Sequence, residues 1–580
     1  MEKKYNKFPC TKINGFDDQA WSGYENICSQ IINKTSGRKK TVIAVDCYPG
    51  VLDFDILPAF TESISPALTI NTKQANLSDE EIFSMIKRNL TDDRVRGVLS
   101  HHKLIEFFDQ KKIQEIKKKI DDVDNGIILV YGVGACLCCD PDLIIYADLA
   151  RWEIQLRYRR GEIANYCAQN YNEDFLRMYK RGFFVDWRVA DRHKQTLFDK
   201  IDFLLDTNEI GHPKMITGEA FRNALKQVAR KPFSVVPYFD EGPWGGQWMK
   251  QVCNLDKNVE NFAWCFNCVP EENSLFLKFG ETIIEIPSVD LVFYQPRKLL
   301  GEKVHARFGK EFPIRFDFLD TMQGGNLSLQ VHPTTEYIQD EFGMHYTQDE
   351  SYYLLDAKEG AHVYLGVKTG IDRKAMIEDL ERAQEGEISF NAEKYINKIP
   401  AKKHDHFLIP AGTIHCSGAG SMVLEISATP YIFTFKLWDW DRLGTDGKPR
   451  PIHIEHGKNV INWDLQTDEI YKNHVNKIKT ICESDDYVEE ETGLHEREFI
   501  ETRRHWFSDK VYHNTNGSVN VMMLVEGEQV IVESPSGKFE PIIFNYAEAF
   551  IIPASVGEYT VSPFEKGGVT EYATIKAFVR

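Results

Sequence analysis

The sequence lacks a long apolar run and an excess of positive charge. Its longest apolar stretch, GIILVYGVGACLCC from Gly126, has 14 residues, whereas a helix needs about 20 to cross a bilayer. Lys and Arg number 69 against 87 Asp and Glu, a formal net charge of -18, which argues against nucleic acid or an anionic membrane as the main partner. We therefore expect a small-molecule substrate, with no nucleic acid and no membrane involved.

Features of secreted proteins are also missing. The first residues, MEKKYNKFPCTKINGFDDQAW, contain charges but neither the apolar segment of a signal peptide nor a cleavage site. The 12 cysteines are scattered, without the spacing of a disulfide framework. Both observations favour a cytoplasmic location.

The domain organisation follows from length and pattern. A chain of 580 residues is too long for one hydrophobic core. We interpret residues 1–37 as a lead-in and residues 38–215 as an α/β domain with a parallel sheet, because strands alternate there with helices. Near residue 230 the pattern changes to short strands separated by Gly, Pro and Asp, and two all-β domains are expected at 230–475 and 494–580. The acidic CESDDYVEEETG before the last domain is interpreted as a solvated linker.

The α/β domain lacks the chemistry of a phosphate-binding loop. A strand from Val42 to Val45 leads into a turn where nucleotide-binding proteins carry a glycine-rich loop. Such a loop needs a lysine for the phosphates and a Ser or Thr for magnesium. The turn Asp46–Val51 has neither, and Pro49 removes a backbone amide.

The next elements are a strand, a glycine turn, a second strand (Leu143 to Tyr146) and a helix rich in arginine, with Arg151, Arg157, Arg159 and Arg160. This order resembles the uridine-kinase-like branch of the P-loop kinases over residues 38–205. Since the loop chemistry is missing, the resemblance implies a degenerate kinase-like domain. Its arginines either hold a phosphorylated ligand or form a solvated basic face.

Candidate metal ligands occur in the all-β region. In LSLQVHP, Gln330 and His332 are two residues apart and share one face of a strand that Pro333 ends. Glu350 begins a later strand, and His415 follows the tight turn of HFLIPAGTIH. Two imidazoles, a carboxylate and an amide suit zinc and leave room for substrate or water. The alternative for each histidine is a hydrogen-bonded structural role in an amphipathic strand.

An internal repeat indicates two β-barrels. FLIPAGTIH at 407–415 recurs as FIIPASVGE at 550–558, and LLDAKEGAHVYLG has a shorter echo in MLVEGEQVIVE. The alignment sets His415 against Glu558, and GSVNVMM carries no carboxylate in the place of Glu350. The first copy is longer by a predicted helical insertion near 371–393. One metal-binding barrel and one metal-free barrel are therefore expected.

Residues 232–580 resemble the type I phosphomannose isomerases, a family of zinc-dependent double cupins. The resemblance rests on four motifs in the family's order: EGPWGGQWM, LSLQVHP, IPAGTIH and WDWDRLGTDGKPRPIHIE. It implies two jelly-roll cupin barrels and one Zn2+ per chain, bound by Gln330, His332, Glu350 and His415. It also implies that Glu425 in MVLEIS is an active-site glutamate and that Arg442 is a basic active-site residue.

Two positions depart from the family's pattern. Gln348 stands where the family usually has a lysine, two residues before the ligand glutamate, and Lys436 stands where it usually has an arginine, six residues before Arg442. A phosphate dianion needs positive partners, ideally a bidentate guanidinium. The two changes are therefore expected to weaken phosphate binding or to alter the sugar that is accepted.

The resemblance implies a zinc-dependent isomerase of a phosphorylated hexose, which interconverts mannose 6-phosphate and fructose 6-phosphate through a cis-enediol. Zinc would act as a Lewis acid, and Glu425 or a zinc-bound water would carry the proton. Lys436 and Arg442 are candidates for neutralising substrate charge, or else form a surface salt bridge with Asp439 or Asp441. The competing hypotheses are a regulator that binds sugar phosphate without turnover and an isomerase of a different sugar.

Overall fold

The computed structural model describes residues 5–430, 432–443, 450, 452–493, 498–565 and 571–580. These residues form two compact units. The N-terminal unit contains residues 10–228 and 270–295, and the C-terminal unit contains residues 5–9, 229–269 and the chain from 296 onward. The units thus differ from the expected boundaries, because residues 270–295 lie within the predicted metal-binding domain but pack with the N-terminal unit.

The N-terminal unit is built on a seven-stranded sheet with the order β2-β8-β7-β6-β3-β5-β4. Five of these strands pair in parallel, which confirms the predicted parallel α/β layer. They are buried almost throughout, as expected for apolar strands covered on both faces. Their bounds are β3 (Lys40–Cys47), β4 (Leu68–Asn71), β5 (Gly126–Gly132), β6 (Leu143–Asp148) and β7 (Phe203–Asp206), with β8 (Lys214–Thr217) and β2 (Ala20–Ser22) antiparallel at one edge.

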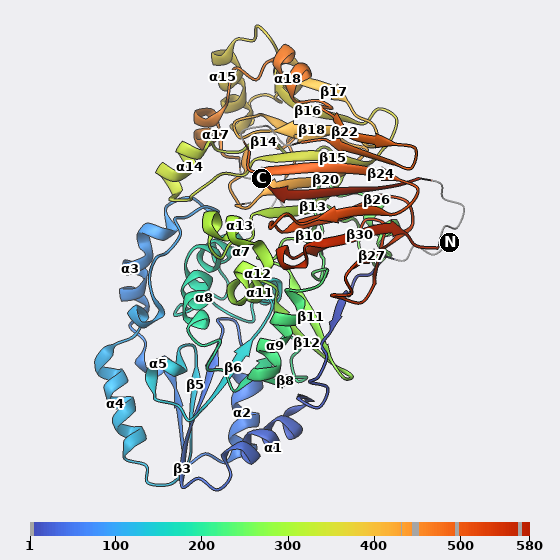
Figure 1. The fold of residues 1–580 in the computed structure, drawn as a ribbon. Helices are drawn as coiled ribbons and strands as arrows, with labels where there is room; N and C mark the ends of the chain where they lie inside the picture. The colour runs from blue at the N-terminus through green and yellow to red at the C-terminus, as the bar shows by residue number, and fades with distance from the viewer. Residues whose placement is uncertain (1–4, 431, 444–449, 451, 494–497, 566–570) are drawn as a thin grey trace. The chain divides into compact units, whose positions relative to one another are not determined.

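Helices lie on both sides of this sheet (Figure 1). On one side α1 (Tyr24–Thr35) and α2 (Asp53–Ile64) bury their apolar stripes against β3 and β5. On the other side, α4 (Gln110–Asp121) points Ile113, Ile116 and Ile120 inward at helical spacing. The remaining helices of eight or more residues in this unit are α3 (Asp79–Leu90), α6 (Arg151–Arg159), α8 (Trp187–Gln195) and α9 (Gly218–Val228).

Residues 270–295 join this unit through a small separate sheet. In it β1 (Cys10–Lys12) pairs in parallel with β11 (Ser274–Phe279), which forms a hairpin with β12 (Thr282–Pro287). The helix α11 (Val289–Tyr294) follows and packs on α9. Because β1 comes from the start of the chain, local sequence pattern carries no sign of this pairing.

The C-terminal unit begins with a barrel of two facing sheets. One sheet has the order β18-β15-β20-β13-β10-β9 and the other the order β17-β16-β19-β14-β21. The first contains β9 (Tyr238–Asp240), β10 (Trp264–Cys268), β13 (Ile314–Asp320), β15 (Glu350–Ala357), β18 (His406–Ile409) and β20 (Ser421–Ala428). The second contains β14 (Leu329–Val331), β16 (His362–Val367), β17 (Ile396–Pro400), β19 (His415–Ser417) and β21 (Phe435–Trp438).

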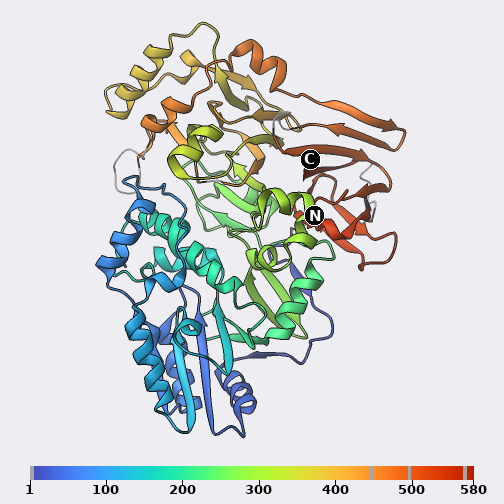
Figure 2. The ribbon, with the colours of Figure 1, turned by 60° about the vertical axis from the view of Figure 1, so that its left-hand side comes forward.

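A second barrel repeats this pattern (Figure 2, red strands). Its sheets have the orders β29-β26-β31-β24-β23-β22 and β28-β27-β30-β25, so each strand has a counterpart in the first barrel and only β21 has none. The predicted duplication is therefore present strand by strand. The bounds are β22 (Lys479–Ser484), β23 (Tyr487–Glu491), β24 (Ile500–Phe507), β25 (Val511–Asn514), β26 (Asn520–Glu526), β27 (Gln529–Glu533), β28 (Ile542–Asn545), β29 (Ala549–Ile552), β30 (Glu558–Pro563) and β31 (Tyr572–Val579).

Two segments between strands bear on the predictions. The insertion in the first barrel contains α15 (Arg373–Gln384), within the expected range 371–393. CESDDYVEEETG was expected to be a solvated linker, and this expectation is wrong because most of it forms the β22–β23 hairpin. There, Glu489 and Glu490 lie opposite His505 and Arg504 of β24, so the acidic run is balanced by cross-strand partners. Within the described part of the chain, no helix has the length and apolar character needed to cross a bilayer.

Candidate metal centre

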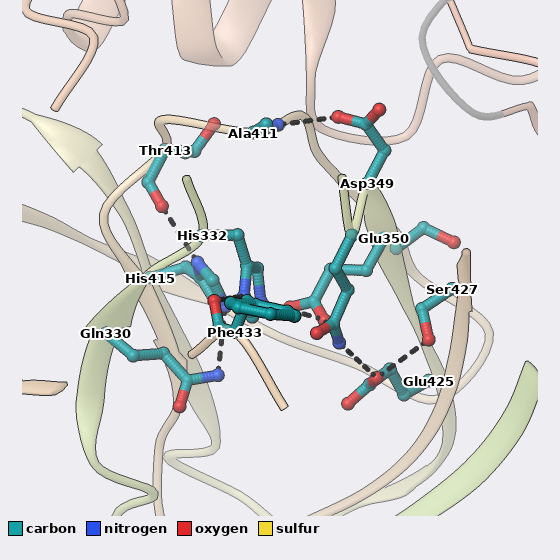
Figure 3. Close-up of polar contacts among 12 residues, drawn as sticks. Gln330, His332, Asp349, Glu350, Ala411, Thr413, His415, Glu425, Ser427 and Phe433 are labelled. Atoms are coloured by element: carbon teal, nitrogen blue, oxygen red, sulfur yellow. Dashed lines mark hydrogen bonds and ion pairs between the residues drawn. The ribbon is translucent and has the colours of Figure 1, made fainter. Parts of the chain in front are cut away.

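Three strands of the first barrel bring the predicted ligands together. Gln330 on β14 lies directly opposite His415, the first residue of β19. His332 follows β14 and keeps the same face by alternation, and Pro333 prevents further pairing. Glu350 opens β15 on the facing sheet. The four side chains meet inside the barrel, as Figure 3 shows.

The geometry is that of two imidazoles facing one carboxylate. His415 Nε2 lies 2.7 Å from Glu350 Oε1, and His332 Nε2 lies 3.1 Å from Glu350 Oε2. All three groups are buried, and their ligand atoms lie within 4.8 Å of one another. Gln330 Nε2 lies 3.2 Å from His415 Nε2. Rotating the Gln330 amide by half a turn would bring its Oε1 to the position of Nε2. The two orientations of a glutamine amide are distinguished only by the hydrogen bonds around it.

The hydrogen bond made by one nitrogen of each imidazole determines which nitrogen remains available to a metal. His415 Nδ1 donates to the carbonyl of Thr413 at 2.8 Å, and His332 Nδ1 donates to the carbonyl of Phe433 at 3.4 Å. These bonds leave both Nε2 lone pairs directed at carboxylate oxygens. Two lone pairs and a carboxylate attract one another only through a proton or a cation, and His332 Nε2 and Glu350 Oε1 have no hydrogen-bond partner. The donor set therefore fits a divalent metal of the zinc type.

Hydrogen bonds to the turn before β19 hold His415 in place. Asp349, next to Glu350, accepts from the Ala411 amide at 2.7 Å, and the Gly412 amide donates to the carbonyl of His332 at 3.0 Å. Gly412 has a φ of 86°, in the region that favours glycine. The turn thus ties all three ligand strands to one another.

Charge around Glu350 is consistent with metal binding. Burial by itself would raise the pKa of this carboxyl group. The imidazoles of His332 and His415 outweigh burial and hold the pKa of Glu350 well below its usual range. The Glu350 carboxyl group is therefore ionised when a protonated imidazole or a metal cation lies beside it.

Glu425 lies beside the ligands on β20. Its Oε1 accepts from Ser427 Oγ at 3.0 Å and from Gln348 Nε2 at 3.3 Å. Burial, followed by the carboxylates of Glu350 and Asp317, raises the pKa of Glu425 well above its usual value. This side chain can therefore hold a proton at neutral pH next to the metal ligands.

Gln348 connects the ligands to Glu425. Its Nε2 donates to Glu350 Oε2 at 3.1 Å and to Glu425 Oε1 at 3.3 Å. The position that departs from the family's lysine is thus at the centre of the site. A neutral amide here satisfies both carboxyl groups but adds no positive charge.

Two further charged residues were missed from the sequence. Arg315 and Asp317 on β13 form an ion pair, and Asp317 lies opposite Glu425 in register. Arg315 Nη1 lies 4.0 Å from Glu425 Oε1. Burial raises the pKa of Asp317 to about 6, with Arg315 opposing and Glu350 adding to the rise. The sequence signal for these two residues is the segment IRFDFLD, in which charged residues alternate with apolar ones along a strand that otherwise belongs to the core.

The remaining predicted site residues lie near β21. Lys436 pairs in register with Gln330 and is half-buried. Arg442 Nη2 lies 2.5 Å from Asp439 Oδ1, and its Nη1 donates to the carbonyl of Asn326 at 2.7 Å. Arg450 also pairs with Asp439, at 2.8 Å. The expected salt bridge of Arg442 with Asp439 is therefore formed, and much of the motif after Arg442 (444–449 and 451) lies outside the described residues.

Comparisons with known proteins found a family model and several similar proteins. A family model described as a domain of unknown function (DUF8485) matches residues 23–230. A mannose-6-phosphate isomerase of Streptococcus mutans is 28% identical over 222 residues, which cover 38% of this chain and 64% of that protein. The chain therefore matches less than two thirds of the length of that relative.

Two other proteins match a larger share of the chain. The probable mannose-6-phosphate isomerase GmuF of Bacillus subtilis is 26% identical over 331 residues, which cover 57% of this chain and 96% of that protein. The crystal structure of the mannose 6-phosphate isomerase from Bacillus subtilis has 18% sequence identity and a TM-score of 0.48, and covers 60% of this chain and 99% of that one.

Proposed function

We propose that this chain is a zinc-dependent aldose–ketose isomerase that interconverts mannose 6-phosphate and fructose 6-phosphate. The observation that carries the proposal is the pair of Nε2 lone pairs of His332 and His415 directed at one carboxylate, Glu350. The curated relatives that match the C-terminal unit carry the name of this activity.

In this proposal, Gln330, His332, Glu350 and His415 hold the metal. Bound zinc would supply Lewis acidity to neighbouring hydroxyl and carbonyl oxygens of the sugar. Glu425 is the proposed proton carrier between C1 and C2, because burial raises the pKa of its carboxyl group and Ser427 and Gln348 keep that group in one orientation. The path passes through a cis-enediol of the sugar.

Lys436 and Arg442 are proposed to meet the phosphate. Lys436 is adjacent to a metal ligand in register. Arg442 would have to exchange its bond with Asp439 for a substrate oxygen, or share its remaining donors. Because Arg442 is engaged by Asp439 and Gln348 is neutral, little positive charge is available to the substrate. This favours one alternative: a protein that binds sugar phosphate with little turnover.

A coupled isomerase assay on zinc-loaded protein separates these two functions. Turnover of mannose 6-phosphate in the wild type, lost together with zinc in His332→Ala and kept in His345→Ala, is the expected result. His345 is an exposed histidine five residues before Glu350, so it controls for the substitution itself. Tight binding of mannose 6-phosphate to the zinc-loaded wild type without turnover would instead establish the binding protein.

For the N-terminal unit we propose a kinase-like arrangement that does not bind nucleotide. The Arg157 guanidinium donates to the carbonyl of Gly50 in the turn after β3 and to the carbonyls of Thr207 and Asn208 after β7, so this turn presents a carbonyl, and not an amide, to its neighbour. The first turn of α2 carries Asp53 and Asp55, which occupy the positive end of the helix dipole that a phosphate would use.

The other arginines of α6 and its C-cap are also engaged. Arg151 pairs with Asp191, and Arg159 lies over the ring of Phe175, 4.7 Å from its centroid. Arg160, which follows α6, pairs with Glu153 at 2.7 Å and Glu162 at 2.8 Å. A titration of the full chain with ATP and Mg2+ is expected to show no binding. The substitution Arg157→Met is expected to lower the free energy of unfolding by about 2–3 kcal/mol, since one buried and two partly buried carbonyls lose a charged donor. Measurable ATP binding by the wild type would contradict the proposal.

A further inference from the structure

The two barrels can be compared residue by residue through their strand pairing. In the first barrel, Glu425 on β20 lies opposite Asp317 on β13. In the second, Lys576 on β31 lies opposite Arg503 on β24. Since β31 and β24 are the counterparts of β20 and β13 in the sheet order, Lys576 stands in the place of Glu425 and Arg503 in the place of Asp317.

The ligand carboxylate has a counterpart as well. Glu350 pairs with Ile409, the residue before Pro410. Asn520 pairs with Ile552, the residue before Pro553. An amide therefore replaces the carboxylate, and the three acidic residues of the first interior become one amide and two cations.

The turn before β30 changes which residue faces inward. The sequence alignment set His415 against Glu558, and this prediction is wrong in three dimensions, because Glu558 is exposed and Tyr559 is buried. Five residues separate the two strands in both turns, 410–414 and 553–557. The side chain of β30 that reaches the counterpart of Glu350 is that of Tyr559, whose hydroxyl donates to Asn520 Oδ1 at 2.9 Å. Tyr559 therefore stands in the place of His415, and its partner in register, His513, stands in the place of Gln330.

The interior of the second barrel is rich in buried donors. Lys576 is only 9% exposed, and its side chain shares the face of Tyr572, a member of the barrel core. Among the described residues, no carboxylate lies within 4.0 Å of its ammonium group. His505 and His513 have ring centroids 4.6 Å apart. His505 Nε2 lies 3.6 Å from Glu489 Oε1, whereas Nε2 of His513 has no hydrogen-bond partner.

The acidic groups nearest to this cluster are already engaged. Glu489 and Glu501 pair with Arg503 at 2.7 Å and 2.6 Å, and Arg503 is about a quarter exposed, at the edge of the interior. Burial lowers the pKa of Lys576 to about 8 and that of His505 to about 4, with Arg503 adding to both shifts and Glu489 opposing both. A group of three metal ligands exists among the described residues only in the first barrel, so a cation is not the natural occupant here.

We propose that the second barrel is an anion site for inorganic phosphate or a phosphate ester, with Lys576 and His513 as its inner contacts and Arg503 at its rim. An ammonium and imidazole N–H groups offer the charge-assisted donors that phosphate oxygens accept. The duplicated barrel has thus exchanged a metal site for an anion site by replacing carboxylates with cations at the same register positions. The proposal does not depend on isomerase activity.

Calorimetric titration of the zinc-loaded full chain with inorganic phosphate tests this site. We expect Lys576→Met to weaken a phosphate site at least tenfold, whereas Lys510→Met leaves it unchanged. Lys510 is an exposed lysine of the same barrel, paired with Glu533. Equal phosphate affinity in the wild type and Lys576→Met, or no binding to the wild type at millimolar phosphate, would overturn the proposal.

Two additional variants guard against a folding artefact. Lys576→Arg keeps the charge and is expected to keep phosphate affinity within a few fold, and His513→Gln introduces the residue that the first barrel has at this position and is expected to weaken binding severalfold. Thermal melting of each variant checks that the fold is intact. If His513→Gln and Lys576→Met both melt as the wild type and bind phosphate equally well, the site does not exist.

The source of the anion is distinguished by competition. Mannose 6-phosphate and inorganic phosphate are titrated into Glu425→Gln, which is expected to be unable to turn the sugar over. Binding of the sugar phosphate at least tenfold tighter than phosphate, and dependent on Lys576, identifies an ester. Equal affinity identifies the free anion, and binding of unphosphorylated mannose to the same site would contradict both.

Discussion

The first and second barrels of the C-terminal unit pair their strands in the same order, yet they line their interiors with opposite charges. Asp317, Glu350 and Glu425 in the first barrel correspond to Arg503, Asn520 and Lys576 in the second. Backbone pairing tolerates both sets, because side chains on one face of a strand do not alter its hydrogen bonds. The comparison teaches that the fold determines where a site can form, and that a few inward positions decide what it binds.

The most severe test of this difference removes the ligand carboxylate. Glu350→Gln keeps the shape of the side chain but removes the charge that faces His332 and His415. We expect zinc affinity to fall by at least about a hundredfold and isomerase activity to be lost. Metal analysis after dialysis and the coupled assay measure both.

The matched change in the second barrel is Asn520→Asp, which supplies a carboxylate at the same register position. Zinc is expected to remain at one per chain, because the positions of His415 and Gln330 are occupied there by Tyr559 and His513. A second equivalent of tightly bound zinc in this variant would show that charge alone separates the two barrels.

Glu425→Gln is expected to reduce kcat by about a hundredfold or more while zinc stays bound. The amide fills the same space beside Gln348 and Ser427 but cannot carry a proton. Steady-state kinetics together with metal content distinguish this outcome from loss of the metal. Unchanged kcat would remove Glu425 from the proposed proton path.

Asp349→Asn is expected to weaken zinc binding by about tenfold. Its carboxylate accepts from Ala411 in the turn that carries His415, so the substitution loosens one ligand without touching the metal. Competition with a chelator measures the change, and the exposed Asp509→Asn is the control. Zinc affinity equal in both variants would mean that the turn is held by other contacts.

The smallest expected effect concerns stability in the second barrel. In phosphate-free buffer, Lys576→Met is expected to raise the free energy of unfolding by about 1–3 kcal/mol. The folded pKa of about 8 lies below the unfolded value, so Lys576 destabilises the native state most fully below pH 8. The unfolded chain binds more protons between pH 8 and about 10.4, so this penalty declines as pH rises. Denaturant unfolding at pH 7 and pH 10 should show that Lys576→Met raises the free energy of unfolding less at pH 10 than at pH 7. A stabilisation that grows with pH would contradict the lowered pKa of Lys576.

Much of the metal centre could be anticipated from local pattern and family resemblance. LSLQVHP alternates and ends at a proline, which placed Gln330 and His332 on one face. IPAGTIH supplied the turn glycine that His415 needs. The pattern of IRFDFLD marks Arg315 and Asp317 as unusual, but it does not show their contact with Glu425. That contact depends on the pairing of β13 with β20, more than 100 residues apart in the chain.

The failed expectations also involve distant or register-dependent contacts. The acidic hairpin β22–β23 is ordered by its pairing with β24, where opposite charges meet. Residues 270–295 pack with the N-terminal unit because β11 pairs with β1. A choice that local sequence left open was also decided by the fold: Arg442 pairs with Asp439 rather than with Asp441.

The sequence by itself determined the alternation of strands and helices in the N-terminal unit, the duplicated barrel pattern and the residue types able to hold a metal, since these depend on periodicity and local chemistry. Only the tertiary structure decided which residues face each barrel interior after the turn before β30, and which charges meet there. The physical reason is that facing is set by strand register. In β30 Tyr559 is buried and Glu558 is exposed, and cross-strand pairing places Lys576 where the first barrel keeps Glu425.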